Sequence, residues 1–92
     1  MILTFRCAET QALFETGSSR RWSNILSVAT RKLAMLHAAV ELRDMRSPPG
    51  NRLEALHGNR AGQYSIRIND QFRICFEWTD AGPINVEIVD YH

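Results

Sequence analysis

Apolar side chains follow a helical period in the first half of the chain. Between residues 22 and 40 they recur every three or four positions, as on one face of an α-helix: Trp22, Leu26, Ala29, Leu33, Leu36 and Val40. This spacing predicts a helix that packs one stripe on the core and continues, with a bend, to about Met45. Arg31 and Lys32 lie off the stripe, so we expect them to face solvent or a partner. The run Ser47-Pro48-Pro49-Gly50 excludes a helix and predicts a loop.

Two shorter elements are expected before this helix. The apolar start of the chain, Ile2 to Phe5, predicts a short first strand. Residues 8–16 predict a short helix that stops where Gly17 follows, because glycine readily adopts the left-handed conformation that closes many helices.

The second half of the chain changes to a period of two. Apolar residues occupy alternate positions in three stretches: Tyr64, Ile66 and Ile68; Phe72, Ile74, Phe76 and Trp78; and Ile84, Val86 and Ile88. Asn69-Asp70 and Asp80-Ala81-Gly82-Pro83 supply the turns between them. Three consecutive strands with one apolar face predict an antiparallel meander that helices must cover. We therefore expect a single α+β domain over residues 1–92, with two layers: N-terminal helices packed on an antiparallel β-sheet.

The turn between the first two of these strands determines their register. A two-residue loop would place apolar positions opposite polar ones, which breaks the alternation of the two faces. A three-residue loop over residues 69–71 instead sets Ile68 opposite Phe72 and keeps both faces consistent. The same register places Arg67 directly opposite Arg73 on the polar face.

Two arginines in this arrangement are unfavourable unless something binds between them. Like charges that face each other on neighbouring strands destabilise a sheet. Two guanidiniums at this spacing would suit an anion that lies across the sheet, because arginine binds phosphate with paired hydrogen bonds. The alternative is that Arg67 and Arg73 extend into water or pair with Glu77 and Glu54.

Charge is unevenly distributed, although the formal net charge is only +1. From residue 20 to residue 73 the chain has ten basic residues (Arg20, Arg21, Arg31, Lys32, Arg43, Arg46, Arg52, Arg60, Arg67, Arg73) and four acidic ones (Glu41, Asp44, Glu54, Asp70). Nearly all of the cations are arginine, which favours phosphate as a ligand, while the alternative is an ordinary solvated surface. A total near neutrality argues against strong non-specific binding to nucleic acid by this protein alone.

Several other classes of protein are not indicated. The 45% hydrophobic and 23% charged composition is typical of globular domains. The two cysteines, Cys7 and Cys75, suggest reduced thiols and no disulfide framework. There is no signal peptide at the start and no stretch long enough to span a membrane, so we expect a soluble cytoplasmic protein.

No metal or cofactor site is expected either. The histidines and cysteines show no metal-ligand spacing, so we predict no metal and no other cofactor. His37 falls within the long helix and is interpreted as a packing residue. The glycine-flanked segment of residues 58–62 lacks the G-K-[ST] of a phosphate-binding P-loop, and we interpret it as a tight loop that carries Arg60.

An acid, a phenol and an imidazole follow the last predicted strand as Asp90-Tyr91-His92. Histidine can accept and donate protons near neutral pH, because its ordinary pKa is about 6.5. The strand before it would hold this tripeptide in place, which makes it a candidate reaction centre. The alternative is an ordinary polar tail.

Four segments together resemble a known family. These are Leu53-Glu54-Ala55-Leu56-His57-Gly58, Gly62-Gln63-Tyr64-Ser65-Ile66-Arg67-Ile68-Asn69, Phe72-Arg73-Ile74-Cys75-Phe76-Glu77-Trp78 and Val86-Glu87-Ile88-Val89-Asp90-Tyr91-His92. In order and spacing they resemble the HigB branch of the RelE superfamily, the toxins of bacterial toxin–antitoxin pairs. The resemblance implies a compact α+β fold and an mRNA endoribonuclease that enters the ribosomal A site. It also implies a helix-turn-helix antitoxin as partner, and a toxin–antitoxin complex on operator DNA.

The resemblance also implies roles for particular residues. Arg73 matches the arginine that contacts the scissile phosphate in this family, and Asp90, Tyr91 and His92 match its C-terminal active-site cluster. Relatives often carry a histidine and a lysine in the segment that precedes the glycine-flanked loop, where this chain has Glu54 and His57.

RNA cleavage without a metal needs a base for the 2′-OH proton, cations for the developing charge on phosphorus and an acid for the 5′-oxygen. Arg67 and Arg73 are the candidates for charge stabilisation. His92 is the candidate for proton transfer, with Asp90 orienting it or acting in its place. Tyr91 is better suited to stacking on a base, since a pKa near 10 makes it a poor base at pH 7.

The second proton-transfer group is open between Glu54 and His57. We expect Arg60, Arg67, Arg73 and Tyr91 to contact RNA. Two alternatives remain: a RelE-like module that binds an antitoxin without cutting RNA, and a small RNA-binding domain outside the toxin class.

Overall fold

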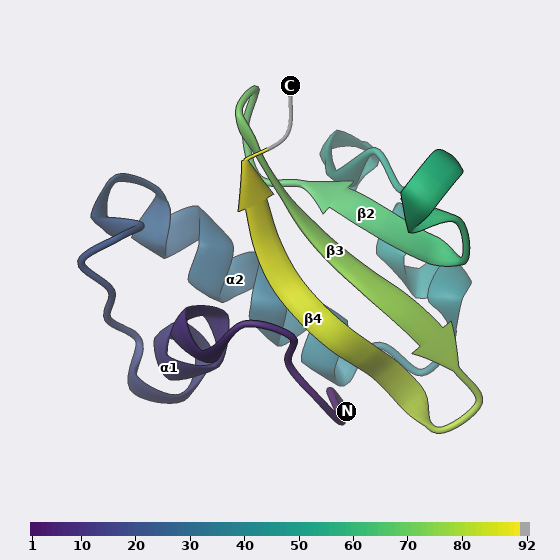
Figure 1. Ribbon diagram of the computed structural model, residues 1–92, viewed down its shortest axis with the longest axis horizontal. Coiled ribbons are helices and arrows are strands. Elements are labelled where there is room, and N and C mark those ends of the chain that lie inside the picture. Colours follow the sequence, from purple (N-terminus) through teal and green to yellow (C-terminus); the bar gives the residue numbers. More distant parts are fainter. Residues whose placement is uncertain (91–92) are drawn as a thin grey trace.

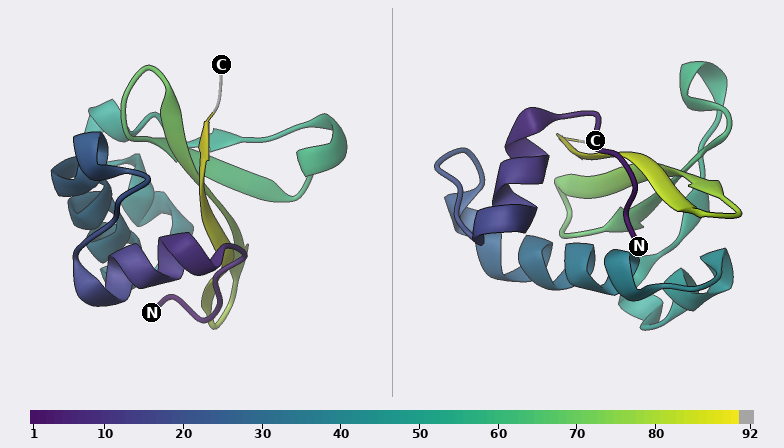
Figure 2. Two further views of the ribbon diagram at one scale, coloured as in Figure 1. Left: turned by 60° about the vertical axis from the view of Figure 1, so that its left-hand side comes forward. Right: turned by 90° about the horizontal axis from the view of Figure 1, so that it is seen from below.

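The helices cover one face of a four-stranded antiparallel sheet and leave the other face open (Figures 1 and 2). The computed structural model describes residues 1–90, so Tyr91 and His92 lie outside the described residues. Its main elements are α1 (Ala8–Thr16), α2 (Leu26–Ala38), β1 (Glu54–Ala55), β2 (Gln63–Arg67), β3 (Phe72–Thr79) and β4 (Gly82–Asp90). The strands are adjacent in chain order, β1-β2-β3-β4. This is the α+β architecture expected from the sequence, with β1 added at one edge.

The first helix forms over the predicted range. α1 ends at Thr16, and Gly17 follows with a φ of 73° and donates its backbone N–H to the carbonyl of Leu13 at 2.8 Å. The first strand, in contrast, is not formed as predicted. The N-terminal segment makes a single parallel bridge, Phe5 with Val86, as it runs along the outer edge of β4.

The second helix is shorter than the apolar stripe suggests. It ends at Ala38, Val40 is 84% exposed, and a separate 3₁₀ turn follows over Leu42–Arg46. The Asp44 carboxylate provides the reason, because it accepts the backbone N–H groups of Val40 at 3.0 Å and Glu41 at 2.9 Å. In a continuing helix these two donors would bond to carbonyls one turn earlier. The same two bonds lower the pKa of Asp44.

Lys32 contradicts the expectation that it faces solvent. It is only 6% exposed, and its Nζ donates to Oδ1 of Asn51. Burial lowers the pKa of Lys32, and the positive charges of Arg31 and Arg67 lower it further. The apolar stripe therefore identified the core face of α2 but not the polar contact beside it.

The predicted register of β2 and β3 is confirmed. Ile66 pairs with Ile74 and Arg67 pairs with Arg73. Ile68 donates its backbone N–H to the carbonyl of Phe72 at 2.9 Å, which leaves residues 69–71 as the turn. The pairing of β3 with β4 differs from simple alternation at a β-bulge, where Glu77 faces Ile84. Ile84 therefore leaves the apolar face that we expected it to share with Val86.

The core lies between α2 and the covered face of the sheet. Its fully buried members include Leu33, Leu36, Ile66, Ile74, Phe76 and Val86. His37 lies at the edge of this core as predicted, with its ring 5.1 Å from that of Phe14 and its Nδ1 accepting the backbone N–H of Ile2 at 3.1 Å.

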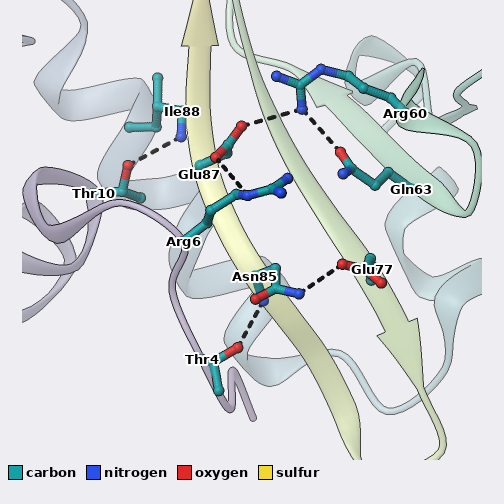
Figure 3. Close-up of polar contacts among 9 residues, drawn as sticks. All are labelled: Thr4, Arg6, Thr10, Arg60, Gln63, Glu77, Asn85, Glu87 and Ile88. Atoms are coloured by element: carbon teal, nitrogen blue, oxygen red, sulfur yellow. Dashed lines mark hydrogen bonds and ion pairs between the residues drawn. The ribbon is translucent and has the colours of Figure 1, made fainter. Parts of the chain in front are cut away.

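The outer edge of β4 is covered by the start of the chain. Leu3 donates its backbone N–H to the carbonyl of Pro83 at 2.9 Å. Further along, Ile88 donates its backbone N–H to the buried hydroxyl of Thr10 at 3.1 Å (Figure 3). These contacts fix the last strand, and so determine where its C-terminal end lies.

Candidate active site on the open face of the sheet

Polar side chains lie in two neighbouring rows across the face of the sheet that no helix covers, which we call the open face. The pairing places Glu54, Ser65, Cys75 and Glu87 in one row across all four strands. The next row contains Arg67, Arg73 and Val89. Residues in one row share a face because side chains alternate along each strand. The open face therefore gathers arginines and carboxylates from distant parts of the chain.

Arg73 is the most firmly held cation of the open face. It is 9% exposed, and its Nε donates to Oγ of Ser65 at 2.7 Å. Its Nη2 donates to the backbone carbonyl of Arg52 at 2.6 Å and lies 4.0 Å from Oε1 of Glu54. A guanidinium with this many partners has a fixed orientation before any ligand arrives.

Arg67 lies opposite Arg73 but is bound elsewhere. It is half-buried and forms an ion pair with Asp70 in the turn that follows β2. Glu77 does not serve either arginine, because its Oε2 accepts a hydrogen bond from Nδ2 of Asn85 at 2.7 Å. Of the two carboxylates expected as alternative partners, only Glu54 contacts its arginine.

A second cluster of charge lies further along the open face. Nη1 of Arg60 is 3.0 Å from Oε1 of Gln63 and 3.2 Å from Oε1 of Glu87. The other carboxylate oxygen of Glu87 lies 3.9 Å from Nε of Arg6 (Figure 3). Arg6 was not predicted to belong to this face, since its place follows from the course of the N-terminal segment along β4.

Cys75 is fully buried beside this cluster. Burial raises the pKa of its thiol, while the nearby Arg60 and Arg73 lower it and Glu87 raises it. The net effect keeps the sulfur protonated at neutral pH, so Cys75 is a poor nucleophile.

The other candidate residues fall at the two ends of the open face. Glu54 is exposed on β1 and adjoins Arg73, whereas His57 is exposed at the start of the 3₁₀ turn Gly58–Arg60. Asp90 ends β4 opposite Phe72, with its Oδ2 accepting a hydrogen bond from Nε2 of Gln71 at 3.1 Å. It therefore lies at the same end of the sheet as Arg73.

The structure brings Arg73, Glu54 and the neighbouring Arg67 together, and does not group His57 with them in any contact among residues 1–90. The roles predicted for Tyr91 and His92 concern residues outside those that the structure describes. Ser65 and the Arg52 carbonyl, which hold Arg73, were missed by the sequence analysis. The serine could have been found, because the confirmed register places it one row from the two arginines.

The metal-ligating types do not cluster within the described part of the chain, where no group of three or more His, Cys, Asp or Glu side chains could hold an ion. Residues 1–90 also contain no helix that is both long and apolar enough to cross a membrane.

Comparison with known proteins identifies the family. The sequence model described as "RelE-like toxin of type II toxin-antitoxin system HigB" matches residues 3–92. This chain belongs to the HigB-like toxins. The family assignment makes it the toxin of a type II toxin–antitoxin system, and such a toxin has an antitoxin as its partner.

This HigB-like toxin is similar to a named toxin, to an uncharacterized protein and, in its fold, to a solved structure. It is 40% identical over 87 residues to Toxin HigB-1 of Vibrio cholerae serotype O1, covering 92% of each chain. An uncharacterized protein of Haemophilus influenzae is 39% identical over 70 residues, which cover 76% of this chain and 68% of that protein. The fold matches a YoeB/ParE toxin from Agrobacterium tumefaciens with a TM-score of 0.56 at 16% identity, over 99% of this chain and 98% of that one.

Proposed function

We propose that this HigB-like toxin is a ribosome-dependent mRNA endoribonuclease that cleaves by attack of the 2′-OH on the adjacent phosphate, without a metal. The observation that carries the proposal is Arg73, a buried guanidinium fixed on an otherwise open, arginine-rich face. The family, whose toxins are endoribonucleases, supports the same chemistry.

Arg73 suits the task of stabilising charge in the transition state. Attack of the 2′-OH adds negative charge to the phosphate oxygens, and a donor that is already oriented stabilises this charge without reorganising. The bonds that hold Arg73 among residues 1–90 use Nε and Nη2. Its remaining amino group, Nη1, is the one we assign to a phosphate oxygen. Arg67 approaches the same phosphate from β2 once it exchanges Asp70 for RNA.

Proton transfer is assigned to groups beside this arginine row. His92 is proposed to take the 2′-OH proton or to protonate the 5′-oxygen, with Asp90 at the end of β4 orienting it or acting in its place. Glu54 is a better second proton-transfer group than His57, because it lies 4.0 Å from Arg73. Tyr91 is proposed to stack on a base, and Arg60 to contact the RNA backbone further along the open face.

The setting of this activity is also part of the proposal. The toxin acts in the cytoplasm on mRNA in the ribosomal A site. Its antitoxin is a helix-turn-helix protein, and the complex of the two binds operator DNA. A small helix-turn-helix protein encoded beside this chain, and co-purifying with it, would support these assignments.

The test is primer extension on a reporter mRNA in bacteria that express the toxin or one of its variants. We expect cuts within translated codons for the wild type, and a loss of about 10²–10³-fold for Arg73→Ala, the usual cost of removing one charge-stabilising donor. His92→Ala should also lose cutting. Arg21→Ala is the matched control, since Arg21 is exposed and pairs with Glu9 of α1 on the helical side.

Cutting by Arg73→Ala at the wild-type rate would refute the assignment of the site. If Arg73→Ala loses cutting but His92→Ala still cuts like the wild type, proton transfer is assigned to Asp90 or Glu54 instead of His92. If the wild type is soluble and expressed but makes no cuts, the chain is the alternative that we consider second: a RelE-like module that binds its antitoxin without cleaving RNA.

A further inference from the structure

Arg73 depends on a partner that lies outside the three long strands. Ser65 holds Nε from the neighbouring strand, and its backbone carbonyl accepts a long bond of 3.4 Å from Nη2. The short bond of Nη2, at 2.6 Å, goes to the backbone carbonyl of Arg52, in the segment that leads into β1. The side chain of Glu54, 54% exposed, is a weaker constraint at 4.0 Å. The position of the Arg52 carbonyl therefore sets the orientation of the outer half of the guanidinium.

The backbone of Arg52 has an unusual conformation. Its φ of 46° and ψ of 58° lie in the left-handed region, which non-glycine residues seldom adopt unless their surroundings hold them there. Its own N–H donates to the carbonyl of Pro49 at 3.2 Å. Something must stabilise the turn Pro49–Asn51 for this carbonyl to remain aimed at Arg73.

Asn51 provides that stabilisation from a fully buried position. Its Nδ2 donates to the carbonyls of Met45 at 3.1 Å and Ser47 at 3.3 Å, which closes the loop on itself. Its Oδ1 accepts a hydrogen bond from the buried Nζ of Lys32 on α2. The side chain of Asn51 thus ties the loop both to its own backbone and to the main helix.

We propose that Asn51, anchored by Lys32, is a positioning residue for Arg73: it holds the loop so that the Arg52 carbonyl fixes Nη2 and leaves Nη1 directed at the phosphate. The reaction that this positioning serves is the proposed cleavage of RNA. The structural link, from Lys32 through Asn51 and the Arg52 carbonyl to Arg73, can be tested apart from that reaction.

The first measurement is hydrogen exchange of the Arg73 Nε–Hε group by NMR in the full ¹⁵N-labelled chain. In Asn51→Ala we expect this proton to exchange faster by about tenfold or more, because loss of the loop frees the guanidinium to open locally. Lys32→Met, which keeps the buried stem but removes Nζ, should shift exchange in the same direction. Leu13→Val is the control, since it perturbs the core at α1 and leaves the loop intact.

The second measurement is the rate of mRNA cutting on ribosomes as a function of toxin concentration. If Arg73 acts only in the transition state, its misplacement in Asn51→Ala should lower the maximal rate by about 10- to 100-fold. The half-saturating concentration should stay unchanged. In an Arg73→Lys background the same Asn51→Ala change should add little, because the oriented guanidinium is already gone.

The NMR result decides the inference. Unchanged Arg73 exchange in both variants would overturn it, whatever the cutting rates are, as would a Leu13→Val shift of equal size. Should Asn51→Ala fail to fold, Lys32→Met alone decides. If Arg73 exchanges faster in the variants but the wild type itself never cuts RNA, the positioning is supported and the proposed reaction is refuted.

Discussion

Arg60 and Glu87 connect the loop before β2 to the last strand, with Nη1 of Arg60 3.2 Å from Oε1 of Glu87. The same carboxylate also lies 3.9 Å from Arg6. One glutamate therefore neutralises two of the arginines of the open face. On the proposed function, an RNA phosphate would have to compete with it for both.

Replacing this glutamate should strengthen binding to RNA. In Glu87→Gln both arginines become available, and at about 0.2–1 kcal/mol for each of the two pairs we expect an affinity gain of about two- to thirtyfold for single-stranded RNA. The dependence of log K on log[salt] should steepen by up to about 1.4, since each added phosphate contact contributes about 0.7. Fluorescence anisotropy at several salt concentrations measures both.

The control for this prediction is Glu77→Gln. It removes the same charge from the same face, but Glu77 binds the amide of Asn85 and releases no arginine. An equal gain in the two variants would mean that only the overall charge matters.

The hydroxyl of Thr10 should be important for stability although it lies far from the open face. Thr10→Val keeps the shape of the side chain but leaves the backbone N–H of Ile88 without its acceptor in a buried place. We expect a loss of about 1–3 kcal/mol in the free energy of unfolding, measured by urea denaturation. Thr10→Ser retains the acceptor and should lose much less of the free energy of unfolding. Equal losses in the two variants would contradict a role for the hydroxyl.

The buried lysine predicts how stability changes with pH. Burial lowers the pKa of Lys32 below its ordinary value of 10.5, so above the lowered pKa the unfolded chain binds more protons than the folded chain. Stability contributed by Lys32 therefore rises as the pH increases toward 10.5 and is absent below the lowered pKa.

Lys32→Met should remove this rise. The comparison is the free energy of unfolding of the two proteins from neutral to alkaline pH, where the difference between them isolates Lys32 from other titrating groups. A difference that stays constant, or that falls as the pH rises, would contradict the direction of the shift.

Gly82 should tolerate no side chain. It has a φ of 138°, and a Cβ added there would overlap the backbone carbonyl oxygen of Met1. Gly82→Ala should lower the free energy of unfolding by about 1–3 kcal/mol through strain and a displaced N-terminal segment. Gly50→Ala is the matched control, because an added Cβ meets nothing within 4 Å there. Equal melting temperatures for the two variants would show that the N-terminal segment can move away from residue 82 without loss of stability.

The sequence was sufficient for the features that depend on local periodicity. The range of α1 and the register that places Arg67 opposite Arg73 follow from Gly17 and from the alternation of polar and apolar positions. Both signals act over a few neighbouring residues, which is why they can be read without the fold.

The features that were missed depend on single long-range or side-chain-to-backbone bonds. The bulge near Asn85, whose φ is 53°, moves Ile84 to the other face without any change in the pattern of residue types. Asp44 ends the helical region early by binding backbone amides, and Lys32 is buried because Asn51 is there to receive it. The pattern of apolar positions reports neither a bond from a side chain to a nearby backbone amide, such as those of Asp44, nor a contact as distant as that of Lys32 with Asn51. Neither the length of α2 nor the support behind Arg73 could therefore be predicted.

The course of residues 3–10 along β4 has a consequence for how the protein is made. Leu3, Thr4 and Arg6 make their backbone hydrogen bonds with Pro83 and Val86 of β4. The hydroxyl of Thr10 accepts the backbone N–H of Ile88 on the same strand. During translation the segment emerges first and its partners emerge last, so the two ends of the fold cannot join while β4 is still inside the ribosome. On the proposed function, a toxin that acts on translating ribosomes would not yet be folded on the ribosome that synthesises it.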